Sequence, residues 1–180
     1  MKNDRIRQLT IAALIAACLA VTSWIAALLP SAIPLTLQTF FVILTALLLR
    51  PRWAAASMLC YIALGALGLP VFAGGKGGAA ILVGPTGGYL VAFVIAAYGG
   101  ALIAGPTRRP HRLPWREVLA ACVMILIIDI IGTVWLAYSA HLSVTAALAA
   151  GVLPFLIGDA VKAAAALAVA RLLSRHLSRY

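Results

Sequence analysis

Residues 118–138 read VLAACVMILIIDIIGTVWLAY and contain a single charged side chain, Asp129. A helix rises about 1.5 Å per residue, so a run of this length crosses a hydrocarbon core roughly 30 Å thick. The rest of the chain is similar, because 64% of its 180 residues are hydrophobic and only 10% are charged. Soluble domains average about 45–50% apolar and about 25% charged residues. Since long apolar runs favour helices over a barrel, the sequence predicts an all-α membrane protein.

The apolar runs predict one integral membrane domain, residues 1–180, built as a single bundle of six transmembrane helices. The expected spans are about 9–29, 35–49, 53–67, 89–104, 118–138 and 147–173. A glycine-rich segment at about 68–88 separates the third span from the fourth. The second run is short for a bilayer, so we expect it to be tilted, broken or buried by its neighbours.

The positions of the basic side chains predict the orientation of the bundle. Of the 14 Lys and Arg residues, Lys76 falls in the glycine-rich segment and Lys162 within the last span, which leaves twelve. All twelve fall on one side of the membrane in a six-span arrangement. Cytoplasmic loops are enriched in Lys and Arg, so both termini are expected in the cytoplasm, in a prokaryotic plasma membrane. Topology therefore explains the net charge of +10, and no basic patch with interleaved aromatic residues suggests nucleic-acid binding.

Catalytic, metal and cofactor sites find no support in the sequence. The four acidic residues are scattered, whereas membrane enzymes that hold Mg²⁺ need clustered carboxylates. No HExxH or GxSxG motif occurs. The run GGKGG at 74–78 lacks the earlier glycine and the following Ser or Thr of a phosphate-binding loop. We therefore predict no enzyme activity, no metal and no cofactor, and any ATP must be hydrolysed by another chain.

Asp159 and Lys162 are the main candidates for a binding site. They lie three residues apart, on one face of the last predicted helix and inside the membrane. Charges there are costly unless they are paired or hydrated. Two interpretations remain open at this point: an ion pair that fixes helix packing, or a polar site for a small zwitterionic or amphipathic solute. Asp129 could face the same cavity, or pair with Lys162 or with a backbone group.

The glycine-rich segment is the candidate for a lid over this site. It contains seven glycines between Gly74 and Gly88, and Tyr89 follows directly. Glycine allows positive φ and close approach of backbone N–H and C=O groups to a ligand. Tyr89 could offer a ring face and a hydroxyl. In the first span, Ala12, Ala16 and Ala20 form a face of small residues, which allows helices to approach closely in lipid.

Four blocks of sequence resemble the BioY family, the biotin-specific substrate-binding (S) components of energy-coupling factor (ECF) transporters. The blocks are PLTLQT at 34–39, GLPVFAGG at 68–75, GPTGGYL at 84–90 and GVLPFLIGDAVK at 151–162. The resemblance implies that Asp159 contacts the ureido ring of biotin and that Lys162 contacts its valerate carboxylate. With the block residues Gln38, Gly74, Gly75 and Tyr89, these two make up the predicted substrate-binding set.

The resemblance also implies partners. The alanine face of the first span would meet a membrane-embedded ECF coupling subunit, which joins the S component to two ATPase subunits. Biotin would bind on the outer side, and toppling of the whole S component would expose it to the cytoplasm. The loop at 71–85 would cap the site, and the family shows no expected role for Asp129.

Alternative functions remain on the sequence alone. An S component for thiamine or riboflavin is the nearest, although Lys162 favours a carboxylate-bearing solute. A small membrane enzyme is disfavoured by the missing catalytic groups. A purely structural subunit would need neither a glycine-rich lid nor an acid and a base inside the membrane.

Overall fold

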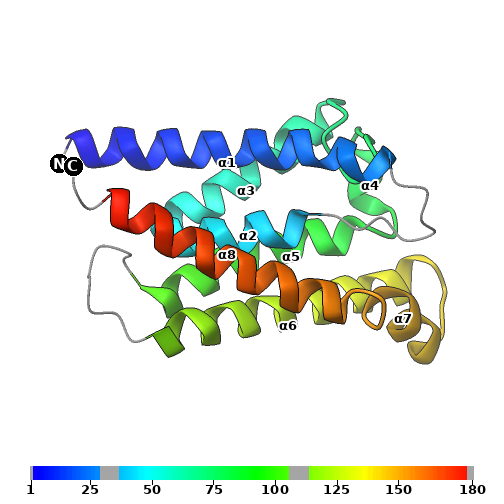
Figure 1. The fold of residues 1–180 in the computed structure, drawn as a ribbon. Helices are drawn as coiled ribbons and strands as arrows, with labels where there is room; N and C mark the ends of the chain where they lie inside the picture. The colour runs from blue at the N-terminus through cyan, green and yellow to red at the C-terminus, as the bar shows by residue number, and fades with distance from the viewer. Residues whose placement is uncertain (1, 29–36, 106–113, 178–180) are drawn as a thin grey trace.

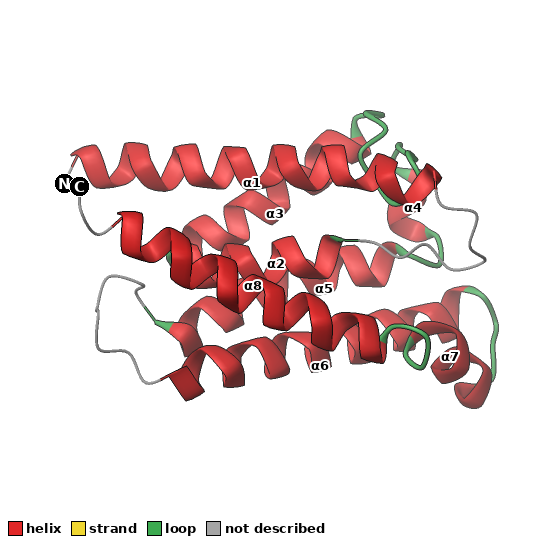
Figure 2. Cartoon of the chain, in the orientation of Figure 1, coloured by secondary structure: helices red, strands yellow, loops and turns green. Residues whose placement is uncertain are grey.

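Every regular element that the structure describes is a helix. The structure is a computed structural model, and it describes residues 2–28, 37–105 and 114–177. The helices are α1 (Lys2–Leu28), α2 (Gln38–Leu48), α3 (Pro51–Ala66), α4 (Ala80–Val83), α5 (Gly87–Ala104), α6 (Pro114–Ser139), α7 (Val144–Gly151) and α8 (Leu156–Leu177). Figure 2 shows helices joined by loops throughout these ranges. The predicted all-α class is confirmed for this part of the chain.

The long helices run back and forth between two ends of one bundle (Figure 1). The start of α1, the α2–α3 junction, the end of α5 and the end of α8 lie at one end, and α4 and α7 lie at the other. Contacts of Arg50 tie the first of these ends together. Its guanidinium pairs with Asp4 at 2.8 Å, and its backbone N–H donates to Gln8 Oε1 at 3.0 Å. The described helix ends that flank the basic stretches of the chain therefore lie at one end of the bundle.

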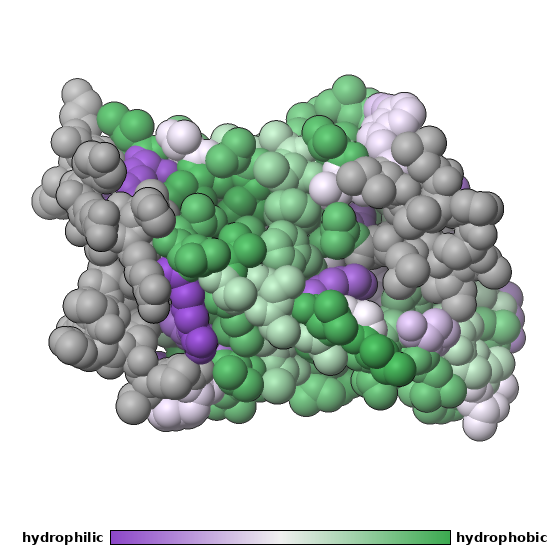
Figure 3. All heavy atoms as spheres, in the orientation of Figure 1, coloured by the Kyte–Doolittle hydropathy of each residue, from purple (hydrophilic) through white to green (hydrophobic). Residues whose placement is uncertain are grey.

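Three described helices are long and apolar enough to cross a membrane by themselves: Asp4–Trp24 in α1, Gly87–Ala104 in α5 and Trp115–Ser139 in α6. Large apolar side chains such as Val91, Leu126 and Ile130 point out of the bundle, with exposed fractions of 48%, 58% and 61%. Figure 3 shows hydrophobic residues over most of the visible described surface between the two ends. An apolar exterior of this extent fits lipid and not water, so the chain is an integral membrane protein.

Helix α2 is short and lies in the middle of the bundle. All of its residues except Phe40 and Phe41 are buried, and it packs mainly against α5 and α8. Among the possibilities left open for the second run, burial by neighbouring helices is the one that the structure shows. Residues 29 and 35–36, at the ends of the first two predicted spans, lie outside the described residues.

The last predicted span, 147–173, differs from the structure because it is not one helix. Helices α7 and α8 are separated by residues 152–155 and meet at an angle of 44°. Pro154 lies in this break, where its ring and its missing N–H disfavour a continuing helix. Apolar residues on both sides conceal the break in a hydropathy pattern. Together α7 and α8 remain apolar and long enough to form one bent span.

The predicted 68–88 loop is also more ordered than expected. It contains the short helix α4, and Gly87 and Gly88 already belong to α5.

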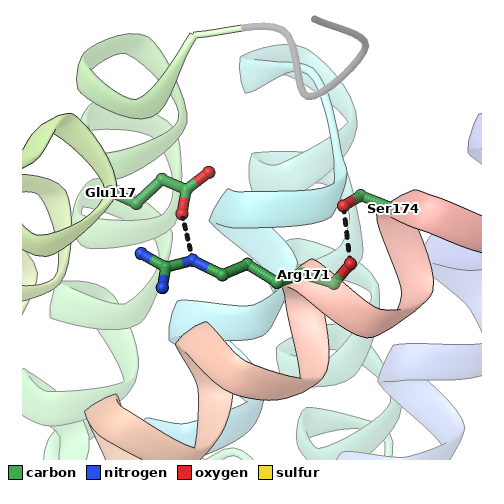
Figure 4. Close-up of polar contacts among 3 residues, drawn as sticks. All are labelled: Glu117, Arg171 and Ser174. Atoms are coloured by element: carbon green, nitrogen blue, oxygen red, sulfur yellow. Dashed lines mark hydrogen bonds and ion pairs between the residues drawn. The ribbon is translucent and has the colours of Figure 1, made fainter. Parts of the chain in front are cut away.

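At the end of the bundle opposite this loop, α6 and α8 are joined by Arg171 Nε, which donates to Glu117 Oε2 at 3.2 Å (Figure 4). Ser174, one turn further along α8, donates a hydrogen bond from its Oγ to the Arg171 carbonyl. Helix α1 begins seven residues before the predicted span, and the other helix limits differ from the predictions by up to four residues.

Candidate functional site

A cavity of about 620 Å³ opens between the glycine-rich loop and the core helices. Ligand pockets for small molecules commonly have volumes of about 300–1,000 Å³. The polar or charged side chains in its wall are Gln38, Thr39, Lys76, Thr86, Tyr89, Asp129 and Asp159. Most of the remaining wall is aliphatic and aromatic, including Phe72, Phe93 and Phe155. The wall can therefore enclose an apolar body and present polar groups at only a few points.

Asp159 and Lys162 form a buried ion pair beside this cavity. Lys162 Nζ donates to Asp159 Oδ1 at 2.9 Å, and the two residues are 9% and 4% exposed respectively. Both come from the first two turns of α8, where a spacing of three residues brings side chains together. Asp159 lines the cavity, and Lys162 lies behind it as its partner. The two side chains therefore form an ion pair, and one of them, Asp159, also lines the cavity.

The aromatic ring of Tyr89 crosses from α5 towards α6 and α7. Gly132 of α6 lies against this ring, and a Cβ at Gly132 would overlap it. The hydroxyl donates to the Gly151 carbonyl at 3.2 Å and lies 3.4 Å from Thr133 Oγ1. The break after α7 leaves the Gly151 carbonyl at the end of a helix, where it is available as an acceptor. Tyr89 therefore joins three helices and lines the cavity.

Gln38 lies at the first turn of α2 and begins a chain of hydrogen bonds that leads to the loop. Its Nε2 donates to the Tyr61 hydroxyl at 2.7 Å, and that hydroxyl donates to the Val71 carbonyl at 2.8 Å. The Tyr61 ring meets Phe72 edge-on, with ring centroids 5.7 Å apart. Gln38 is 5% exposed and lines the cavity. Its amide is therefore held in one orientation beside any ligand.

Gly74 and Gly75 shape the loop and do not line the cavity. They occupy a tight turn in which Phe72 and Lys76 exchange backbone hydrogen bonds of 2.8 and 3.3 Å. Both glycines have positive φ, 77° and 69°, which other residues rarely adopt. The adjacent residues Ala73 and Lys76 do line the cavity. In this structure the two glycines act by aiming their neighbours at the site.

The loop is fixed over the cavity at two points. Gly78 N–H donates to the Gly65 carbonyl at the end of α3, at 2.7 Å. Trp135 Nε1 of α6 donates to the Gly84 carbonyl at 2.9 Å. Residues between these two anchors, including Ala80 and Ile81, form part of the cavity wall. The arrangement fits the predicted cap.

The predicted partner face of the first helix is occupied within the chain. Ala12 and Ala16 are 5% and 3% exposed, and Ala20 packs partly buried against the same core. Ser57 Oγ of α3 donates to the Ala12 carbonyl at 2.8 Å, which shows how closely α1 and α3 approach. The small residues permit close packing within this chain, where Ala12 and Ala16 are already buried, and contact of this face with a partner subunit stays a prediction.

Sequence reasoning left Asp129 open and did not select Lys76, Phe93 or Phe155. The structure includes all of them in the cavity wall. A lone acid inside a span is a signal of function, whereas aromatic residues in apolar runs give none. Within the described ranges, no group of three or more His, Cys, Asp or Glu side chains could hold a metal ion.

The sequence model of the BioY family matches residues 1–179. This chain belongs to the BioY family. Among its relatives, a protein named probable biotin transporter BioY from Pyrococcus horikoshii is 46% identical over 138 residues, which cover 77% of this chain and 78% of that protein. Biotin transporter BioY2 from Lactococcus lactis is 38% identical and covers 100% of this chain and 98% of its own length. The resemblance found in the four sequence blocks is confirmed.

The fold is also similar to a known one. A crystal structure described as the S-component for biotin from an ECF-type ABC transporter superposes with a TM-score of 0.82. The match covers 97% of this chain and 94% of the other, at 24% sequence identity. This BioY-family chain and that protein therefore share a fold.

Proposed function

We propose that this chain binds biotin and brings it into the cell as the substrate-binding S component of an ECF-type transporter. Membership of the BioY family and relatives named biotin transporters support this function. The observation on which the proposal rests most is the cavity under the glycine-rich loop, whose wall includes the buried Asp159, held from behind by Lys162.

The chemistry of biotin suits this cavity. Biotin combines an apolar ring system and an apolar valerate chain with a ureido group and a terminal carboxylate. A mostly apolar wall with a few fixed polar groups binds such a molecule by burial and orients it by hydrogen bonding. Asp159 accepts a hydrogen bond from a ureido N–H. The predicted contact of Lys162 with the carboxylate, at the other end of biotin, requires Lys162 to leave the 2.9 Å pair with Asp159. Gln38 and Tyr89 contact the rings, and the turn at Gly74 and Gly75 positions the cap.

In the membrane, we propose six spans, formed by α1, α2, α3, α5, α6 and the bent pair α7–α8. Both termini face the cytoplasm of a prokaryotic cell, and the glycine-rich loop faces outward. The excess of Lys and Arg at the end that includes the start of α1 supports this orientation. Biotin then enters from the outer side, beneath the cap.

We further propose that the chain works with an ECF transmembrane coupling subunit and two ATPase subunits. The likeness in fold to an S component of an ECF-type transporter supports this assembly. Because Ala12 and Ala16 are buried against α3, the docking surface on α1 must use exposed residues. Ala13 and Ala17 are exposed and four residues apart, with Leu14 and Val21 nearby. Small residues there would admit a partner helix.

Titration of biotin into the purified protein tests the function. We expect binding in the nanomolar-to-micromolar range, without displacement by thiamine or riboflavin. A protein that is well folded but does not bind biotin would remove the proposal. Displacement of biotin by thiamine or riboflavin would instead favour an S component for another vitamin.

A further inference from the structure

Asp129 presents a second carboxylate to the same cavity, from a different helix. It lies in α6, whereas Asp159 lies in α8, and both belong to the cavity wall. The two carboxyl-bearing side chains therefore border one shared space. The next residue, Ile130, points away from the bundle and is 61% exposed. Asp129 is therefore on the cavity side of α6.

The two carboxylates differ in what already binds them. Asp159 is bound by Lys162 at 2.9 Å. Among residues 2–28, 37–105 and 114–177, no side chain or backbone group makes a hydrogen bond or an ion pair with the Asp129 carboxylate. A carboxylate at membrane depth is costly without donors. Asp129 is partly buried in the cavity wall, so its oxygens are open to a donor that enters the cavity.

A ureido group supplies donors in the required number. It has two N–H groups on one ring, and each carboxylate can accept one of them. We propose that Asp129 is a second acceptor for the N–H groups of the ligand, alongside Asp159, an inference that rests on the proposed binding of biotin. Asp129 then determines specificity for a cyclic urea, since a ligand with only one N–H leaves one carboxylate without a donor.

The test compares biotin with its two derivatives that carry a methyl group on one or the other ureido nitrogen. Each ligand is titrated into the purified wild-type chain and into the Asp129→Ala and Asp129→Asn variants. Ile130→Ala is the matched control, because it alters the same helix turn on its outer face. Thermal unfolding without ligand shows whether each variant is folded.

We expect Asp129→Ala to weaken biotin binding roughly 10- to 100-fold, the range for a hydrogen bond to a charged group. Asp129→Asn keeps an acceptor oxygen and loses less, while Ile130→Ala binds as the wild type does. With one methylated isomer, wild type and Asp129→Ala bind alike, because the N–H that Asp129 accepts is already absent.

Two results would overturn the inference while leaving the proposed function in place. One is unchanged biotin affinity in Asp129→Ala. The other is an equal loss for biotin and for both methylated isomers, which would show a general effect on the cavity. If the wild-type chain itself fails to bind biotin, the proposed function fails and this inference fails with it. Thiamine binding that Asp129→Asn abolishes would assign the carboxylate to a cation instead.

Discussion

Lys162 and Asp159 show how one buried pair can serve both packing and recognition. Their 2.9 Å contact neutralises two charges that would otherwise be costly at this depth. Asp159 also lines the cavity, so its free carboxylate oxygen remains available to a ligand. The pair is therefore sensitive to loss of either member, and less sensitive to loss of both.

Removal of Lys162 alone should destabilise the fold. Lys162→Met leaves the Asp159 carboxylate buried without its partner, which costs about 3–5 kcal/mol in comparable buried pairs. The double variant Asp159→Leu/Lys162→Met removes both charges and should recover most of this loss. Thermal unfolding in detergent without ligand measures the difference. Equal stability of the single and double variants would contradict the interpretation.

Comparing biotin with biotin amide should show whether Lys162 or Lys76 contacts the carboxylate of biotin. Lys76 is exposed and lines the cavity. If Lys162 contacts the carboxylate, Lys162→Ala weakens biotin binding roughly 10- to 100-fold, as expected for loss of a charged hydrogen bond. Binding of biotin amide should fall much less. Isothermal titration of both ligands, with Lys76→Ala as the matched variant, checks this. A selective loss in Lys76→Ala would assign the carboxylate to the loop.

At the scale of helices, the close packing of α5 and α6 positions Tyr89. Gly132→Ala places a methyl group against the Tyr89 ring, so the ring or the helix must move. We expect a loss of about 1–3 kcal/mol in stability, as in other overpacked sites, together with weaker biotin binding. Gly99→Ala is the matched control on α5, because a Cβ there meets no atom within 4 Å. Unfolding and titration should leave this control close to wild type.

The exposed face of α1 should matter for uptake and not for binding. Ala17→Trp places a bulky side chain on the proposed docking surface, so uptake of labelled biotin by cells that contain the ECF module should fall. Biotin binding by the purified variant should be unchanged, because Ala17 is not in the cavity wall. Ala164→Trp, on an exposed position of α8, is the control. Normal uptake with Ala17→Trp would exclude this surface.

For the whole molecule, the orientation predicts which positions are accessible from outside the cell. In a variant without the three native cysteines, Lys76→Cys should react with a membrane-impermeant maleimide on intact cells. Arg52→Cys should react only after the membrane is permeabilised. Both native side chains are exposed in the structure, so burial does not limit labelling. The reverse pattern would invert the proposed topology.

The parts of the fold that were predictable are those that depend on polarity. Apolar runs indicated helices, and basic residues indicated which ends meet. Side chains of the wrong polarity for lipid, such as Asp159, indicated where to look for a site. The break at 152–155 was less visible, since the residues around Pro154 are as apolar as a continuous span. Aromatic wall residues such as Phe93 could not be separated from ordinary lipid-facing ones.

The sequence by itself determined that the solvent is lipid, that the chain is helical and that its basic connections lie at one end. It did not determine which face of a helix is internal. Ala12 and Ala16 are buried while Ala13 and Ala17 are exposed, yet all four are the same residue. In water the buried face is marked by hydrophobicity, but lipid is as apolar as a protein core. Only the tertiary structure could decide that α3 covers one alanine face and that Asp129 enters the cavity.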